Sequence, residues 1–201
     1  MTVKPTVVYL IRHSDYENPK NLFHGRLPGF PLSGKGKKMA ERVATYLADK
    51  PIVAVYSSRL TRAYETAEII AKKHHLKVIT DKRLLDIKTP LQGKSTAYVD
   101  AMDANLYQPK FIAAGGERLE DVYKRTDNFL KEKVLQHNGA SIVIVTHGDP
   151  IMSTYTIYSG KRLPKWYSNT RWYVPMAGGF KIVFDTVKKL PTISHLPDVS
   201  R

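Results

Sequence analysis

Two histidines of this chain each follow directly on a run of β-branched and large apolar residues. Residues 7–11 lead into Arg12 and His13, and residues 142–146 lead into His147. Unbroken apolar runs predict strands buried on both faces, as in parallel sheets, and the carboxyl ends of such strands open onto the ligand crevice. The sequence therefore predicts a nucleophile and an anion-binding arginine at one rim of a sheet.

A further group of polar residues follows the strand predicted over residues 52–56. Ser57 and Ser58 offer hydroxyl donors, and the start of the following helix offers free backbone amides. Arg62 adds a guanidinium fork suited to phosphate or carboxylate. Because this segment also follows a strand, we expect it at the same rim as His13. Taken alone, Arg62 could equally be a surface residue of its helix.

Two other motifs carry less information. Residues 29–35 spell most of a nucleotide-binding P-loop, but Gly36 stands where Ser or Thr is needed for magnesium, and no buried strand leads into the motif. His74 and His75 are adjacent, cannot both face one point on a helix, and lack a nearby carboxylate pattern. We expect neither a nucleotide phosphate site nor a metal site at these positions.

Five short motifs with chemistry-bearing residues occur in order along the chain. They are Arg12-His13, Pro31-Leu32-Ser33 with Gly36, Ser57-Ser58 followed by Arg62-Ala63 and Thr66-Ala67, Gly115-Gly116-Glu117, and Thr146-His147-Gly148. In this order and spacing the chain resembles the histidine phosphatase superfamily, in its phosphoglycerate-mutase-like branch. The resemblance spans residues 7–151, which is most of the chain.

The resemblance implies that His13 is the nucleophile, which becomes phosphohistidine, and that Arg12, Arg62 and His147 surround the transferred phosphoryl group. The chemistry agrees, because a neutral imidazole is a competent nucleophile at pH 7 and neighbouring guanidinium groups disfavour its protonation. Guanidinium groups also hold phosphoryl oxygens by charge-assisted hydrogen bonds, each worth about 1.5–3 kcal/mol. Such a transfer needs no metal and no cofactor, and none is expected.

The position of the general acid departs from the family pattern. Relatives often carry Glu after a Leu-x pair, where this chain has Asp86 after two leucines, and the loop that follows is one residue shorter. Asp86 is the leading candidate to protonate the leaving oxygen, a role worth about 10²- to 10⁴-fold in rate. Asp149, close to the second histidine, is the alternative, and Glu117 is a more distant one.

Several other residues are candidates for substrate contacts. Asn21 and Arg26 lie in the loop after the nucleophile, where relatives often place phosphate or substrate contacts. Glu117 belongs to a helix-start motif of the family, and a simple turn into a capped helix explains that motif equally well. Three aromatic residues either pack the sheet edge or roof the pocket: Trp166, Tyr167 and Trp172.

Composition narrows the class of protein. The chain has 201 residues, 42% of them hydrophobic, so we expect a single folded domain over residues 1–201. No apolar run approaches the ~20 residues that cross a bilayer, the N-terminus does not resemble a secretory signal, and cysteine is absent. We therefore expect a soluble, cytoplasmic protein with no membrane partner. No pattern in the chain indicates an oligomeric state.

The net charge is +14, from 32 Lys and Arg against 18 Asp and Glu. Such an excess favours anionic partners, which include nucleic acid, a membrane surface and a small phosphorylated substrate. The basic residues are scattered, and no recognition helix, zinc finger or aromatic RNA-binding signature accompanies them. A small phosphorylated substrate is therefore the expected partner, nucleic acid is not, and a solvated basic surface is the alternative explanation.

The elements that must position these residues alternate between strand and helix. Residues 84–116 interrupt the alternation as an excursion over the active site, with some helix near 96–107, and residues 191–201 form an extended or frayed tail. Strands are expected over residues 7–11, 52–56, 76–80, 142–146 and 180–187, and helices over residues 33–47, 60–70, 117–136 and 150–158. The pattern predicts an α/β three-layer sandwich with a mostly parallel central sheet.

These observations together predict a metal-independent phosphomonoesterase that acts through phosphohistidine on His13. The alternative within the same fold is a phosphoglycerate mutase, which must retain the phosphoryl group and exclude water. Asp86 in place of Glu, and the altered loop after it, favour hydrolysis. An alternative of another class is a non-catalytic phosphoanion- or RNA-binding protein, which the presence of both histidines and both arginines disfavours.

Overall fold

The computed structural model describes residues 4–165, 167, 173–185 and 190–197. Within them a six-stranded sheet runs in the order β3-β2-β4-β1-β5-β6. Neighbouring strands from β3 to β1 pair in parallel, and β5 and β6 continue the sheet antiparallel. The mostly parallel sheet of the prediction is confirmed. The strands are β1 (Thr6–Arg12), β2 (Ile52–Ser57), β3 (Val78–Thr80), β4 (Ser141–Thr146), β5 (Gly179–Phe184) and β6 (Thr192–His195).

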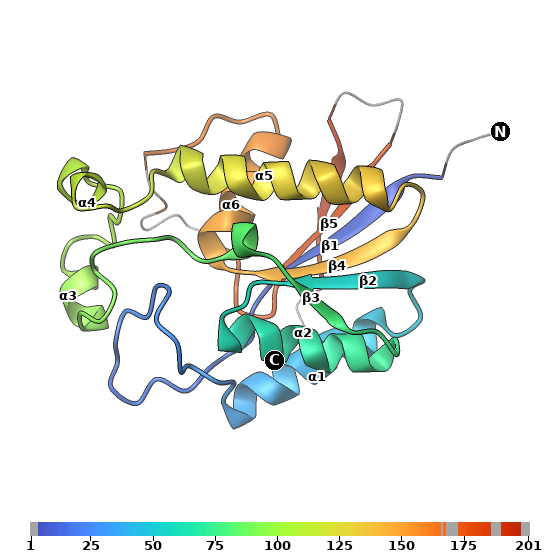
Figure 1. The fold of residues 1–201 in the computed structure, drawn as a ribbon, viewed down its shortest axis with the longest axis horizontal. Helices are drawn as coiled ribbons and strands as arrows, with labels where there is room; N and C mark the ends of the chain where they lie inside the picture. The colour runs from blue at the N-terminus through green and yellow to red at the C-terminus, as the bar shows by residue number, and fades with distance from the viewer. Residues whose placement is uncertain (1–3, 166, 168–172, 186–189, 198–201) are drawn as a thin grey trace.

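Helices cover both faces of the sheet, which gives the three expected layers (Figure 1). α1 (Gly34–Leu47) and α2 (Thr61–Lys73) lie on one face, and α5 (Leu119–Gln136) and α6 (Gly148–Tyr158) lie on the other. No helix in the described part of the chain is long and apolar enough to cross a membrane.

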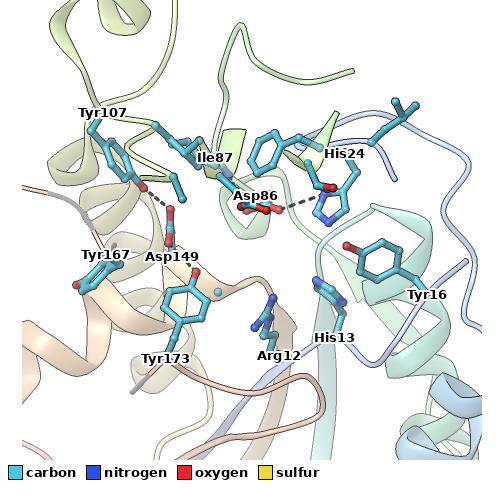
Figure 2. Close-up of a pocket in the computed structure, with 17 residues that line it drawn as sticks. Arg12, His13, Tyr16, His24, Asp86, Ile87, Tyr107, Asp149, Tyr167 and Tyr173 are labelled. Atoms are coloured by element: carbon cyan, nitrogen blue, oxygen red, sulfur yellow. Dashed lines mark hydrogen bonds and ion pairs between the residues drawn. The ribbon is translucent and has the colours of Figure 1, made fainter. Parts of the chain in front are cut away.

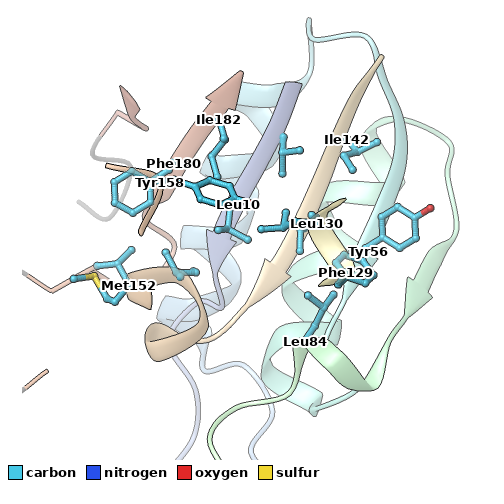
Figure 3. Packing of buried hydrophobic residues seen from close by; sticks show 14 of the residues in the cluster. Leu10, Tyr56, Leu84, Phe129, Leu130, Ile142, Met152, Tyr158, Phe180 and Ile182 are labelled. Carbon is cyan, nitrogen blue, oxygen red and sulfur yellow. The ribbon is translucent and has the colours of Figure 1, made fainter. Parts of the chain in front are cut away.

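Strands β1 and β4 are buried on both faces because their residues supply both hydrophobic layers. Leu10 and Ile142 pack with Phe129 and Leu130 of α5 on one side (Figure 3). Ile11 and other residues of the same strands pack with α1 and α2 on the opposite side. Burying a large aliphatic or aromatic side chain contributes about 1.5–3 kcal/mol, so this double layer fixes β1 and β4 firmly.

The pairing register of β1 and β4 brings the two histidines together. Arg12 lies opposite Thr146 in the parallel ladder, and the backbone N–H of His13 donates to the carbonyl of Thr146 at 2.9 Å. His13 and His147 are therefore the next residues of adjacent strands, at the carboxyl edge of the sheet. A slip of one residue would turn the side chains of either strand to the other face, so the register itself specifies this pairing.

The C-terminal part differs from the sequence prediction. β5 ends at Phe184, residues 186 and 187 of the predicted strand lie outside the described residues, and a further strand, β6, pairs antiparallel with β5. The tail expected from residue 191 is extended, but it is a paired edge strand over Thr192–His195.

The excursion after β3 is also more structured than expected. A 3₁₀ turn (Lys82–Leu84) leads into it, and it contains two short helices, α3 (Thr96–Asp100) and α4 (Pro109–Ala113). The helix expected near 96–107 is present as α3, whereas α4, which starts on a proline, was missed. A small separate apolar cluster holds the excursion together, and it consists of Ile87, Leu91, Val99, Leu106, Phe111 and Val122.

Candidate active site

A cavity of about 390 Å³ opens at the carboxyl ends of β1 and β4. Arg12 and His13 point into it from the sheet, and Asp86 and His24 lie across from them (Figure 2). Asp149 lines the same cavity from the first turn of α6. The structure therefore brings both predicted strand ends and both leading acid candidates to one pocket.

His13 is 1% exposed and presents one specific nitrogen toward the neighbouring arginine. Its Nδ1 lies 2.9 Å from the carbonyl oxygen of Ser14, which can only accept, so Nδ1 carries the ring proton. The opposite nitrogen, Nε2, accepts a 3.3 Å hydrogen bond from Nε of Arg62. Burial, and then the charges of Arg62 and Arg12, lower the pKa of His13 well below its ordinary value of 6.5. The ring is therefore neutral at pH 7 with its lone pair on Nε2.

The loop that follows β1 holds His13 in this orientation. The backbone N–H of Ser14 donates to Oγ1 of Thr66 on α2 at 3.0 Å. On the other side, the Asp15 carbonyl packs against Gly36 in the first turn of α1, so close that a Cβ there would lie 1.8 Å from the oxygen. Gly36 therefore lets the loop after β1 pack against α1. This packing explains why glycine, and not the Ser or Thr of a P-loop, follows residues 29–35.

His147 is completely buried and stands beside the nucleophile, with the two ring centroids 5.1 Å apart. Nη2 of Arg62 donates to its Nδ1 at 3.2 Å, so Nε2 carries the proton and donates to Oγ of Ser58 at 2.9 Å. Burial and the Arg62 charge lower the pKa of His147 well below 6.5. In this state His147 is neutral and acts as an acceptor toward Arg62.

The two predicted arginines occupy different depths. Arg62 is 1% exposed, and its Nη2 also donates to Gly25 O at 3.0 Å and to Asp86 Oδ2 at 2.9 Å. Arg12 lines the cavity, donates from Nη1 to Val174 O at 2.7 Å, and leaves its buried Nε without a hydrogen-bond partner among the described residues. Arg59, which shares the segment of Arg62, is exposed.

The acid candidates have contrasting surroundings. Oδ2 of Asp86 accepts from Arg62, and Oδ1 accepts from the Ile87 N–H at 2.9 Å. Asp149 accepts hydrogen bonds from the hydroxyls of Tyr107 at 2.5 Å and Tyr173 at 2.6 Å (Figure 2). Burial raises the pKa of Asp149, against the effect of those two bonds.

The remaining predicted residues lie outside the cavity lining. Asn21 is exposed, and its backbone takes a left-handed φ of 47° in a turn. Arg26 donates from Nη2 to Glu117 Oε2 at 2.8 Å and from Nε to the backbone carbonyl of Asp86 at 2.7 Å. Arg125 joins them, because its Nη2 donates to the same Asp86 carbonyl at 3.1 Å. Arg26 and Glu117 therefore hold the backbone of Asp86 in place, and neither faces the pocket.

Four lining residues carry no signal that sequence reasoning could use. His24 sits alone in a loop, and Tyr16, Tyr107 and Tyr173 come from three separate irregular segments. The His24 ring stacks on Phe23, and burial together with the Arg62 charge lowers its pKa to about 4. Tyr167 lines the cavity, as one of its two predicted roles required, whereas Trp166 and Trp172 lie outside the described residues.

Among the residues that the structure describes, no three or more His, Asp or Glu side chains are grouped so that they could hold a metal ion. The site instead combines a neutral nucleophile with Arg12 of the cavity lining, the deeper Arg62, and lining carboxylates that include Asp86 and Asp149. Guanidinium groups next to a neutral imidazole can bind a phosphoryl group and orient it for attack by nitrogen.

Comparison with known proteins decides the family. A sequence model of the histidine phosphatase superfamily (branch 1) matches residues 8–175. The chain belongs to this superfamily. The match includes both strand-ending histidines and both arginines, so the predicted resemblance is confirmed.

Relatives in the superfamily include both hydrolases and mutases. Phosphoserine phosphatase 1 of Hydrogenobacter thermophilus is 32% identical over 167 residues, which cover 79% of each chain. A 2,3-bisphosphoglycerate-dependent phosphoglycerate mutase of Thermoplasma acidophilum is 31% identical over 157 residues, 76% of each chain. Among solved structures, Bacillus stearothermophilus YhfR aligns with a TM-score of 0.81 at 25% identity, covering 98% of this chain and all of that one.

Proposed function

We propose that this protein is a metal-independent phosphomonoesterase that passes the phosphoryl group of a small phosphate ester first to His13 and then to water. The observation that supports it most directly is the state of the His13 ring. With its proton on Nδ1 and its pKa lowered, the ring carries an available lone pair on Nε2 at neutral pH. A nucleophile in this state needs no metal-bound water.

In the first step, the Nε2 lone pair of His13 forms a bond to phosphorus while the bond from phosphorus to the ester oxygen breaks. Arg12 and Arg62 hold the phosphoryl oxygens. To reach them, Arg62 gives up its hydrogen bond to Nε2 of His13. The departing oxygen takes a proton from Asp86.

In the second step, water attacks the phosphohistidine. Asp86, now a carboxylate, accepts a proton from that water, and the electron pair of the N–P bond returns to Nε2. The proton stays on Nδ1 of His13 throughout and is donated to the Ser14 carbonyl. One ester and one water thus give one alcohol and one phosphate, and His13 is regenerated.

Hydrolysis of 4-nitrophenyl phosphate in the presence of a chelator tests the proposal. We expect turnover by the wild-type protein and a loss of at least about 10³-fold in His13→Asn. His75→Asn is the matched control, because His75 is exposed and Asn tolerates its left-handed φ of 56°. A phosphoryl label that is retained in alkali, lost in acid and missing from His13→Asn would identify the intermediate. Equal activity of His13→Asn and the wild type would rule out the mechanism.

Phosphoglycerate mutase activity is the second candidate, because one relative bears that name. It differs in a single measurable property, since a mutase keeps the phosphoryl group away from water. Interconversion of 2- and 3-phosphoglycerate after priming with a bisphosphate, with little release of phosphate, would replace the hydrolase proposal.

A further inference from the structure

The outer part of the cavity differs in charge from the protein as a whole. The chain carries a net charge of +14. Among the described residues that line the cavity, however, Arg12 is the one guanidinium or lysine side chain, whereas Asp86, Asp100 and Asp149 supply three carboxylates. The basic surface is therefore not concentrated where the leaving group of a substrate must lie.

The arginines close to His13 and Asp86 already have roles or partners. Arg12 and Arg62 are the groups that would bind the phosphoryl oxygens of the substrate. Arg26, the next arginine along the chain, is bound to Glu117 and to the Asp86 backbone. A second anionic group on the substrate would therefore meet carboxylates, and the described lining offers it no cation beyond Arg12. In a partly buried cavity such like-charge contact is screened less than at the surface.

Most of the other lining residues are aromatic or aliphatic. Phe23, Tyr107 and Tyr167 form part of the walls, and Leu22, Ile87 and Leu106 add aliphatic surface. Asp100, at the C-terminal end of α3, is exposed and lies among these apolar residues. Aromatic walls suit planar or apolar groups and can also hold a cation over the ring face.

From this lining we infer that the substrate is a phosphate monoester whose leaving group has an aromatic or apolar body and carries no second anion, being neutral or cationic. This inference rests on the proposed phosphomonoesterase activity and adds the class of substrate. It separates the protein from enzymes for phosphorylated acids and bisphosphates, which need a second cation for the additional carboxylate or phosphate.

Three aryl phosphates of nearly equal size test the inference. They are 4-hydroxymethylphenyl phosphate, 4-aminomethylphenyl phosphate and 4-carboxyphenyl phosphate, which are neutral, cationic and anionic at the para position. We expect kcat/KM for the first two to exceed that for the third by about tenfold or more at low salt, with a smaller ratio at high salt. A carboxylated ester that is hydrolysed as well as the neutral one, or better, would overturn the inference.

A charge-removing variant of the cavity lining tests whether the lining carboxylates cause the preference for neutral over carboxylated esters. Asp100→Asn removes one lining charge from an exposed position, so we expect the ratio between neutral and carboxylated esters to fall severalfold. Asp49→Asn removes an exposed carboxylate that does not line the cavity, and it should leave the ratio unchanged. The same ratio in wild type and Asp100→Asn would contradict the assignment.

Binding separates this inference from the proposed mechanism. Dissociation constants of the three esters for His13→Asn, measured by calorimetry, report charge preference without any phosphoryl transfer. If the wild type hydrolyses none of the esters but the variant still binds them in the expected order, the proposed function fails and the inference stands. If hydrolysis depends on His13 but the anionic ester binds most tightly, the inference fails alone.

Discussion

The carboxylate of Asp86 and the guanidinium of Arg62 form a buried ion pair, with Nη2 and Oδ2 2.9 Å apart. The same guanidinium donates from Nε to His13, at 3.3 Å. One planar group therefore connects the proposed nucleophile to the proposed acid. Because Arg62 leaves the first turn of α2, the helix that packs on the sheet sets the separation of the two reacting groups.

The first prediction concerns Asp86→Asn. An amide at this position cannot protonate the leaving oxygen, so we expect kcat/KM for an alkyl phosphate to fall about 10²- to 10⁴-fold. The fall for 4-nitrophenyl phosphate should be much smaller, because nitrophenolate leaves without a proton. The measurement uses a series of aryl phosphates whose phenols differ in pKa. We expect kcat/KM of Asp86→Asn to depend more steeply on the leaving-group pKa than that of the wild type.

The matched variant for this experiment is Asp149→Asn, which alters the other carboxylate of the cavity. If Asp149→Asn steepens the dependence and Asp86→Asn slows good and poor leaving groups equally, Asp149 is the acid. Asp86 would then serve to position Arg62.

The second prediction concerns Tyr107, whose hydroxyl donates to Asp149 at 2.5 Å. This bond joins the excursion to the first turn of α6. Tyr107→Phe leaves a buried carboxylate oxygen short of one donor, so the free energy of unfolding should fall by about 1–3 kcal/mol. We also expect faster proteolytic cleavage within residues 96–113 than in the wild type.

Tyr98→Phe is the control for this variant, because Tyr98 is 50% exposed on the same excursion. Unchanged stability and cleavage rate in Tyr107→Phe would mean that the hydroxyl does not fasten the excursion.

The third prediction is a dependence of stability on pH. Burial lowers the pKa of His13, His24 and His147 in the folded protein, to about 4 for His24. In the unfolded chain each takes a proton near pH 6.5, so the unfolded state binds more protons below that pH. Stability is thus fully present above pH 6.5 and declines as the pH falls toward 4, by up to about 1.4 kcal/mol per pH unit for each histidine that stays neutral.

Chemical denaturation between pH 7 and pH 5 measures this slope. His24→Gln should reduce the slope of unfolding free energy against pH by the equivalent of about one proton, whereas His75→Asn, at an exposed position, should not. A wild-type slope that is unchanged in His24→Gln would contradict a neutral, buried His24. In the same range kcat/KM should stay high below pH 6.5, since His13 keeps its lone pair.

The fourth prediction uses two glycines of α1. A Cβ on Gly36 would lie 1.8 Å from the backbone oxygen of Asp15, whereas a Cβ on Gly34 would meet nothing within 4 Å. Gly36→Ala must displace the loop that carries His13, so we expect a loss of about 1–3 kcal/mol in unfolding free energy together with reduced turnover. Gly34→Ala, in the same helix, should be neutral or stabilising by up to about 1 kcal/mol. Similar melting temperatures for the two variants would contradict this account.

The sequence was sufficient to predict the half of the site that comes from regular strands. His13 and His147 end apolar runs, and such runs in a parallel sheet have one arrangement of their carboxyl ends. Arg62 could be predicted to join them, because the helix start after the strand over residues 52–56 faces the same edge of the sheet. These residues needed only local patterns and the general rules of sheet topology.

The other half could not be predicted, because its residues meet through long-range contacts that involve at least one irregular segment. Tyr107 and Asp149 are 42 positions apart, and no periodicity connects them. Arg26 was expected to contact substrate, yet it binds Glu117, which lies 91 residues away. Such pairings depend on how the excursion folds onto the sheet, and neither composition nor spacing contains that information.

The ladder between β1 and β4 has a consequence for how this protein can diverge. His13 and His147 inherit their separation from hydrogen bonds of the backbone, so no side chain of the excursion is needed to keep them in register. Insertions, deletions and substitutions beyond Asp86, in residues 87–116, can therefore accumulate while the two histidines keep their separation. New specificities can arise by exchange of that segment alone, and grafting it between relatives is a practical route to altered substrates.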